Sequence, residues 1–252
     1  MIFRNFFFYY EGNEGVGFEH FGSEHLCIIA LGAAVIVLVC FRYSRADDKT
    51  QRRMDKTVGF WVLVIIYALR NIYYFVVGVE IVTVLPLHLC SISGFLCMAH
   101  TIRQKEWIGQ VLYALCLPGT FCAILYSDWT YFPAFSFISL QAYIYHFAIP
   151  MYIIMQLISR SIIPDIRKIW TIAVFMAVIV PSIHYFNYRN GTNYMFLNYP
   201  SPDSPLVPLA DKFGNPGYIL PYFIGVWCVI IVMILAGMLV FKYRSVKQLH
   251  RH

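Results

Sequence analysis

The feature that most limits how this chain can fold is a series of seven apolar runs, each about as long as a helix that crosses a lipid bilayer. Such a helix needs about 20 residues. Of the 252 residues, 60% are hydrophobic and 13% are charged, whereas soluble domains carry about 25% charged residues. One small core cannot bury that much apolar surface, so we expect a single integral membrane domain, an all-α bundle of seven transmembrane helices. The predicted spans lie near residues 24–42, 57–77, 83–101, 107–126, 135–159, 166–186 and 217–241.

Positive charge alternates between the loops on the two sides of these runs. Fifteen of the 19 Lys and Arg residues lie in the loops after the first, third and fifth runs and in the C-terminal tail. Arg4, Arg189 and Lys212 lie on the opposite side, and Arg70 lies within a span. Basic loops remain in the cytoplasm. The pattern predicts a plasma-membrane protein with its N-terminus outside and its C-terminus in the cytoplasm, and a six-span arrangement would break the alternation.

The segment 187–216 differs from the other connections in length and composition. It contains five prolines and many Asn, Asp and Ser residues, which predicts neither helix nor strand. Outer loops of about 30 residues are uncommon and often act as lids or binding elements. Its aromatic residues indicate that it folds back over the outer mouth of the bundle.

Composition argues against several classes of function. The net charge of +6 follows the topology, and no Arg- and Lys-rich arm is present, so we expect no nucleic-acid partner. The seven cysteines lie inside or at the edge of apolar segments, and none forms a CxxC pair. Neither a disulfide framework nor a zinc site is expected, and the chain is expected to need no metal or other cofactor.

Polar side chains within the predicted spans concentrate in the outer half of the bundle. At about 1.5 Å per residue, they lie roughly 8–16 Å below the outer edge or at the outer rim. The inner half is expected to be almost purely apolar until the basic loops begin. Because ionisable groups within a membrane are costly, these residues predict a functional pocket. The candidates are His25, Arg70, Asn71, His88, Cys90, Gln141, His146 and His184.

Each candidate also has a simpler interpretation. His25 and His184 could equally be interfacial histidines in contact with water. Arg70 could extend to the outer surface, although the cost of burying a guanidinium favours a role in binding a phosphate or a developing negative charge. Cys90, taken alone, could be a small core residue.

The spacing of His88 and Cys90 bears on which group could activate the thiol. Residues two apart on a regular helix point in nearly opposite directions. A base for Cys90 is therefore expected from another helix, and His146 is the best candidate. His88 could contact a different helix, unless Pro86 distorts the turn enough to bring it to Cys90.

Four short segments, in this order along the chain, resemble the YwaF-type family of bacterial integral membrane proteins. They are FGSEH ending at His25, LPLHLC ending at Cys90, YIYH ending at His146, and NYM at 193–195. That family is similar to a eukaryotic transmembrane glycerophospholipid acyltransferase with an essential cysteine and histidine. More remotely, it is similar to intramembrane threonine hydrolases that cleave fatty-acid esters of hydroxy fatty acids.

The resemblance implies that Cys90 is an acyltransferase nucleophile and that His146 is its histidine, with Pro150 completing the motif. Leu89 and Ser91 flank Cys90 where the eukaryotic pattern has Pro and His.

The leading hypothesis is a phospholipid acyltransferase or transacylase that acts on membrane phospholipids in the outer leaflet. His146 would take the thiol proton, and Arg70, helped by Asn71 or Asn193, would bind the lipid phosphate or the oxyanion. The Pro-rich loop would exclude water. The alternative is a non-catalytic lipid- or solute-binding protein or a transporter. A third interpretation, haem or metal ligation by His25, His88, His146 and His184, fits less well because these histidines lie on four different spans.

Overall fold

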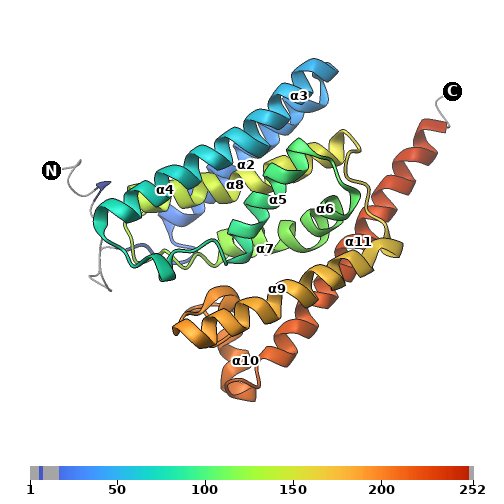
Figure 1. The fold of residues 1–252 in the computed structure, drawn as a ribbon. Coiled ribbons are helices and arrows are strands. Elements are labelled where there is room, and N and C mark those ends of the chain that lie inside the picture. The colour runs from blue at the N-terminus through green and yellow to red at the C-terminus, as the bar shows by residue number, and fades with distance from the viewer. Residues whose placement is uncertain (1–5, 8–16, 250–252) are drawn as a thin grey trace.

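The computed structural model describes residues 6–7 and 17–249, so Arg4 and Arg251, which the charge pattern assigns to opposite sides, lie outside it. In the described residues the chain is all-helical (Figure 1). The helices are α2 (Ser23–Ser44), α3 (Asp48–Lys56), α4 (Leu63–Val77), α5 (Leu89–Ile102), α6 (Glu106–Val111), α7 (Leu117–Leu125), α8 (Phe137–Ile158), α9 (Ile169–Asn190), α10 (Leu206–Phe213) and α11 (Ile219–Leu249). Two π-helical segments, η1 (Thr57–Val62) and η3 (Leu112–Cys116), join α3 to α4 and α6 to α7. Three short 3₁₀ turns complete the list: η2 (Ile81–Thr83), η4 (Ile166–Lys168) and η5 (Tyr194–Phe196).

Six helical stretches of the described chain are long and apolar enough to cross a membrane. They are Ser23–Ser44, Asp48–Val77, Glu106–Leu125, Phe137–Ile158, Ile166–Asn190 and Ile219–Tyr243. Each overlaps a predicted span, and the prediction of a helical, multi-pass membrane protein is confirmed.

The third predicted span, 83–101, differs from the prediction. Only Leu89–Ile102 is helical, and this helix is shorter than the other six. Residues 84–88 form bends and turns instead. Pro86 explains the difference, because proline has no N–H to donate and disfavours helix at the preceding residue. At about 1.5 Å per residue, α5 spans roughly 21 Å, less than the hydrocarbon core. Whether this segment completes a seventh crossing stays a prediction.

The helices form two groups that meet at one end of the molecule (Figure 1). Helices α2, α4, α5 and α7 pack around the largely buried α8, while α9 and α11 lie beside them. We call the end where the two groups meet the joined end. There the Tyr113 hydroxyl donates to the Met233 carbonyl of α11 at 2.7 Å. Nearby, the Gln110 amide donates to Ile163 O at 2.8 Å and accepts from Asp165 N at 3.2 Å. These bonds hold the two groups together close to the basic loops.

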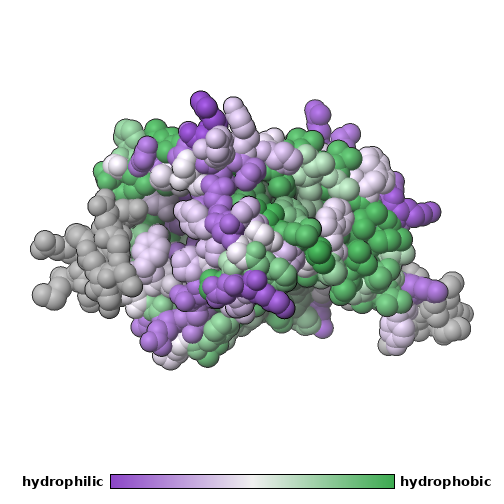
Figure 2. Space-filling view, turned by 90° about the horizontal axis from the view of Figure 1, so that it is seen from below, coloured by the Kyte–Doolittle hydropathy of each residue, from purple (hydrophilic) through white to green (hydrophobic). Residues whose placement is uncertain are grey.

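Helices α9 and α11 present apolar side chains on their outer surfaces. Figure 2, which views this side of the molecule, shows hydrophobic residues gathered over the half towards the C-terminus. Exposed apolar residues of α9 and α11 include Trp170, Val174, Val178, Val232, Leu235 and Leu239. A surface of this kind is stable in contact with lipid rather than water.

The prediction that 187–216 is neither helix nor strand is wrong. Helix α9 continues to Asn190, and α10 forms over Leu206–Phe213. The proline residues do not prevent this helix, because Pro205 precedes its first residue and Pro208 lies within its first turn, where no intrahelical N–H bond is required. The stretch between the two helices is irregular except for η5.

The expectation of an apolar inner half is also wrong near the basic loops. His100, Gln110 and Gln156 are buried at that end of the bundle. His100 Nδ1 is 2.9 Å from the Tyr152 hydroxyl. The Gln156 amide donates to Asp55 at 2.6 Å. A glutamine in an apolar sequence gives little indication of burial, because its partner lies about 100 positions away.

Candidate functional site

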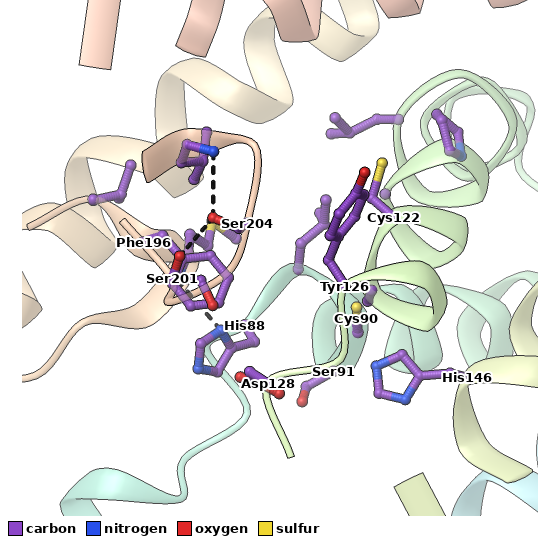
Figure 3. Close-up of a pocket in the computed structure, with 18 of the residues that line it drawn as sticks. His88, Cys90, Ser91, Cys122, Tyr126, Asp128, His146, Phe196, Ser201 and Ser204 are labelled. Carbon is purple, nitrogen blue, oxygen red and sulfur yellow. Dashed lines mark hydrogen bonds between the residues drawn. The ribbon is translucent and has the colours of Figure 1, made fainter. Parts of the chain in front are cut away.

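One large pocket lies between the two groups of helices, with a volume of about 800 Å³. Its walls come from α4, the start of α5, η3 and α7, α8, α9, the 195–209 region and α11. Residues of α9 and α11 supply a mostly apolar wall that includes Phe175, Ile179, Val180, Val226, Val229 and Ile230. Polar groups gather opposite this wall, where Figure 3 shows His88, Cys90, Ser91, Asp128 and His146 around the same space.

Cys90 lines this pocket from the first turn of α5. Its helix begins at Leu89, directly after the non-helical stretch 84–88, and His88 occupies the N-cap position. No side chain caps this end of the helix. The first N–H groups of a helix have no intrahelical acceptor and carry partial positive charge. This end of the helix favours negative charge near the Cys90 sulfur, whereas the apolar surroundings of the pocket favour the neutral thiol, so reaction at Cys90 needs a proton acceptor.

His146 lines the pocket from α8 in a defined tautomer. Its Nδ1 is 2.7 Å from the Ala142 carbonyl, and because a carbonyl only accepts, Nδ1 carries the proton. In the neutral ring Nε2 is then the proton acceptor. The ring packs on Trp129, with centroids 4.8 Å apart. A hydrogen bond from the Tyr145 hydroxyl to Ser91 O at 3.3 Å joins the neighbours of His146 and Cys90 and fixes the register of α8 against α5.

His88 also lines the pocket. On a regular helix, residues two apart point in nearly opposite directions, so His88 and Cys90 could not both face it. The distortion that Pro86 introduces resolves this, because His88 precedes the first helical residue and is extended. Its Nδ1 accepts from the Met195 backbone N–H at 3.4 Å. The neutral ring therefore carries its proton on Nε2, as a hydrogen-bond donor.

Arg70 brings a positive charge to the pocket lining. Its Nη1 donates to the Val84 carbonyl at 3.3 Å, and the guanidinium lies over the Tyr74 ring at 4.8 Å. Within the described residues, neither of the two ion pairs involves Arg70. Its charge is thus available to an anion. Gln141 lines the same pocket and donates to Ile138 O at 3.1 Å.

Tyr194 fastens the loop between α9 and α10 to the segment that leads into α5. Its buried hydroxyl accepts from Leu85 N at 2.8 Å and donates to Val82 O at 2.8 Å. Burial raises the pKa of Tyr194, which keeps this donor protonated. Asn187 holds the backbone of Tyr194 by accepting from its N–H and donating to its carbonyl, both at 2.9 Å. The loop thereby fixes the irregular stretch that carries His88.

Four of the candidate residues lie outside the pocket lining. His25 is fully buried between Phe21 N and Ile124 O, at 3.0 and 2.9 Å. His184 is exposed on α9. The Asn71 amide donates to Tyr67 O at 2.8 Å. Asn193 holds the loop between α9 and α10, donating to Tyr199 O and accepting from Asn198 N.

Sequence reasoning missed Asp128 and two serines, Ser201 and Ser204, all of which line the pocket. Asp128 lies in the short connection between α7 and α8, and an acidic residue between two apolar spans was the available signal. The serines lie in a polar loop in which no pattern singles them out. Within the described residues, no group of three His, Cys, Asp or Glu side chains is placed to hold a metal ion.

The pocket therefore combines a thiol at a helix N-terminus, a histidine whose free nitrogen accepts a proton, and a guanidinium that forms no ion pair with the described residues. These are the components that nucleophilic catalysis on a carbonyl requires. The apolar wall opposite suits an alkyl chain, and the size of the pocket falls within the range of small-molecule sites.

Comparison with known proteins identifies the family but gives no closer relative. The sequence matches the TMEM164 family over residues 20–247. No curated protein and no solved structure matches the chain. The resemblance to YwaF-type proteins and the relation to acyltransferases stay predictions. The match covers every helix from α2 to α10 and nearly all of α11, and the chain therefore belongs to the TMEM164 family, a family of transmembrane proteins.

Proposed function

We propose that this membrane protein is a phospholipid acyltransferase or transacylase in which Cys90 is the nucleophile and His146 the base. The observation that carries the proposal is the pairing of these residues in one pocket. Cys90 lies at the N-terminus of α5, and His146 presents a proton-accepting Nε2 from α8. The charge pattern supports a pocket on the outer side of a plasma membrane.

In the first half-reaction, His146 Nε2 takes the proton from the Cys90 thiol. The thiolate attacks the ester carbonyl carbon of a donor phospholipid, and a C–S bond forms. The tetrahedral intermediate then expels the lysophospholipid oxygen, which takes the proton from His146. The acyl group remains on Cys90 as a thioester.

In the second half-reaction, the hydroxyl of an acceptor lysophospholipid gives its proton to His146 and attacks the thioester carbonyl. A C–O bond forms, the C–S bond breaks, and the departing thiolate recovers the proton. The two half-reactions are the reverse of one another in form, so a single histidine serves both.

The groups around Cys90 support charge development in both steps. The free N–H groups of the first turn of α5 favour negative charge on the carbonyl oxygen. Arg70 and the Nε2–H of His88 are suited to the lipid phosphate. The apolar wall formed by α9 and α11 suits the acyl chain and limits the access of water, which would otherwise hydrolyse the thioester.

The test is an acyl-transfer assay with the full-length protein in lipid nanodiscs, a phospholipid with an isotope-labelled acyl chain and an unlabelled lysophospholipid. Cys90→Ser is expected to abolish the labelled product. Cys122→Ser is the matched control, because Cys122 lines the same pocket from α7. Equal activity of Cys90→Ser and the native protein would refute the proposal.

The second candidate is a lipid-binding protein without catalysis. The extent of the apolar wall favours it, since such a wall binds an alkyl chain whether or not chemistry follows. In that case both cysteine variants would bind phospholipid as the native protein does, and none of the three proteins would transfer an acyl group.

A further inference from the structure

A second group of charged residues lies far from the pocket, on the helix α3 that precedes α4. Four basic residues of α3 follow one another at intervals of three, one and three residues: Lys49, Arg52, Arg53 and Lys56. Residues three, four and seven apart share one face of a helix, and all four are exposed. They line a groove of about 660 Å³ together with Asp48, Thr57 and Trp61.

The opposite face of α3 is fixed to the bundle, so the orientation of this basic face is set. The Gln51 amide donates to Tyr43 O of α2 at 3.0 Å. One turn later, Asp55 accepts from the Tyr43 hydroxyl at 3.2 Å and from Gln156 of α8 at 2.6 Å. At the start of the helix, Asp47 caps Thr50 N at 3.1 Å.

The π-helical segment η1 brings an aromatic residue into the same groove. A π-helix closes its turn with bonds between residues five apart, and Trp61 is five residues after Lys56. The Trp61 side chain is 56% exposed. Tryptophan at the end of a membrane span typically lies at the level of the lipid head groups.

The length of this helix places the groove at the membrane surface. Asp48–Val77 is one helical stretch of 30 residues, or roughly 45 Å at 1.5 Å per residue. The hydrocarbon core accounts for about 30 Å of that length. The polar α3 therefore extends into the head-group layer of one leaflet, with Trp61 at its inner boundary.

Among the described residues, none of the four cations takes part in an ion pair. In the described part of the chain, the two ion pairs join Arg167 to Asp165 and Lys168 to Glu106. Asp48 lines the groove at its start, but four cations leave an excess of positive charge there.

We propose that this groove is a binding site for the phosphate of an anionic phospholipid in the leaflet that surrounds α3. The cations would hold the phosphate, and Trp61 would pack against the glycerol and the upper part of the acyl chain. A lipid is favoured over a soluble anion because the groove combines the charge with an aromatic side chain at head-group depth. The site is separate from the Cys90 pocket and does not depend on acyl transfer.

The test uses native mass spectrometry of the purified, delipidated full-length protein in detergent. It is titrated with dioleoylphosphatidylglycerol, with zwitterionic dioleoylphosphatidylcholine, or with soluble glycerol 3-phosphate. We expect phosphatidylglycerol to bind about tenfold more tightly than phosphatidylcholine, and this preference to be lost in the variant Lys49→Gln, Arg52→Gln, Arg53→Gln, Lys56→Gln.

The matched control removes the same charge elsewhere on the basic side of the protein, as Arg42→Gln, Arg45→Gln, Arg103→Gln, Lys105→Gln. It should keep the preference, and Trp61→Ala should weaken binding without a change of charge. If the four-site groove variant is not monodisperse, Arg52→Gln with Lys56→Gln replaces it. Equal loss in groove and control variants, no preference for phosphatidylglycerol, or equally tight binding of glycerol 3-phosphate would overturn the proposal.

Discussion

Two nitrogen atoms with opposite roles characterise the pocket at the scale of single residues. The bond from His146 Nδ1 to Ala142 O leaves Nε2 as an acceptor. The bond from Met195 N to His88 Nδ1 makes His88 Nε2 a donor. In the proposed reaction, His146 is thus set to take the thiol proton, and His88 is set to donate a hydrogen bond to the lipid phosphate.

Replacement of the base tests this division. His146→Gln is expected to reduce acyl transfer by about 10²–10⁴-fold, because the amide cannot take the thiol proton. The assay is the nanodisc transfer reaction described above. The control is His184→Gln, a histidine that is exposed on α9 and absent from the pocket lining. Similar losses in the two variants would contradict the role of His146.

A second residue-scale prediction concerns the close packing of α5 on α8. A Cβ atom on Gly94 would overlap the hydroxyl of Tyr145, whose bond to Ser91 O sets the register of the two helices. Gly94→Ala is therefore expected to lower the free energy of unfolding by about 1–3 kcal/mol. Thermal unfolding in detergent measures this. Gly225→Ala is the control, because a Cβ there meets no atom within 4 Å, and an equal effect in both variants would contradict the packing argument.

At the scale of elements, the decisive feature is where α5 begins. Hydropathy predicts a span over 83–101, but the helix starts at Leu89, and Val84 and His88 of the preceding stretch line the pocket. Non-helical backbone at membrane depth is tolerated where it lines a cavity or is buried in protein. The sequence indicated the possible distortion through Pro86. It could not indicate that Tyr194, more than 100 positions away, supplies the hydrogen bonds that this stretch needs.

Depth along the predicted spans explains which pocket residues could be identified from the sequence. Arg70, His88, Cys90, Gln141 and His146 share a depth that can be counted along predicted spans, and all five line the pocket. His25 shares that region too, but both of its nitrogens bond to backbone atoms. Depth is readable from sequence, whereas the direction of a side chain around the helix axis depends on packing. Asp128, Ser201 and Ser204 lie in connections, where no periodicity applies.

Removal of the Tyr194 hydroxyl tests the coupling between the outer loop and α5. Tyr194→Phe leaves Leu85 N and Val82 O without this partner and is expected to cost about 1–3 kcal/mol of stability. Hydrogen exchange should become faster in residues 82–88 and 192–200. Tyr199→Phe, at an exposed position of the same loop, is the control. Unchanged exchange at 82–88 in Tyr194→Phe would show that the loop does not hold this segment.

At the scale of the whole molecule, the joined end and the pocket end differ in what connects the helices. Hydrogen bonds from Tyr113 and Gln110 hold α11 and the connection that leads into α9 against the main group at the joined end. Further along, the two groups separate around the pocket. The basic loops lie at the joined end, so the pocket is predicted to open on the outer side.

Topology mapping tests that orientation. A membrane-impermeant maleimide is expected to label Asp203→Cys in intact cells and Lys105→Cys only after permeabilisation, because basic loops remain in the cytoplasm. The background lacks the exposed native cysteines Cys27, Cys122 and Cys228. Labelling of both positions in intact cells, or the reverse pattern, would contradict an outer pocket.

The most direct test of the central claim is intact-protein mass spectrometry of gently purified protein, beside Cys90→Ser. The account predicts an adduct of fatty-acyl mass that neutral hydroxylamine releases and that the variant lacks. An adduct that persists in Cys90→Ser, or none after incubation with phospholipid donors, would contradict a thioester at Cys90.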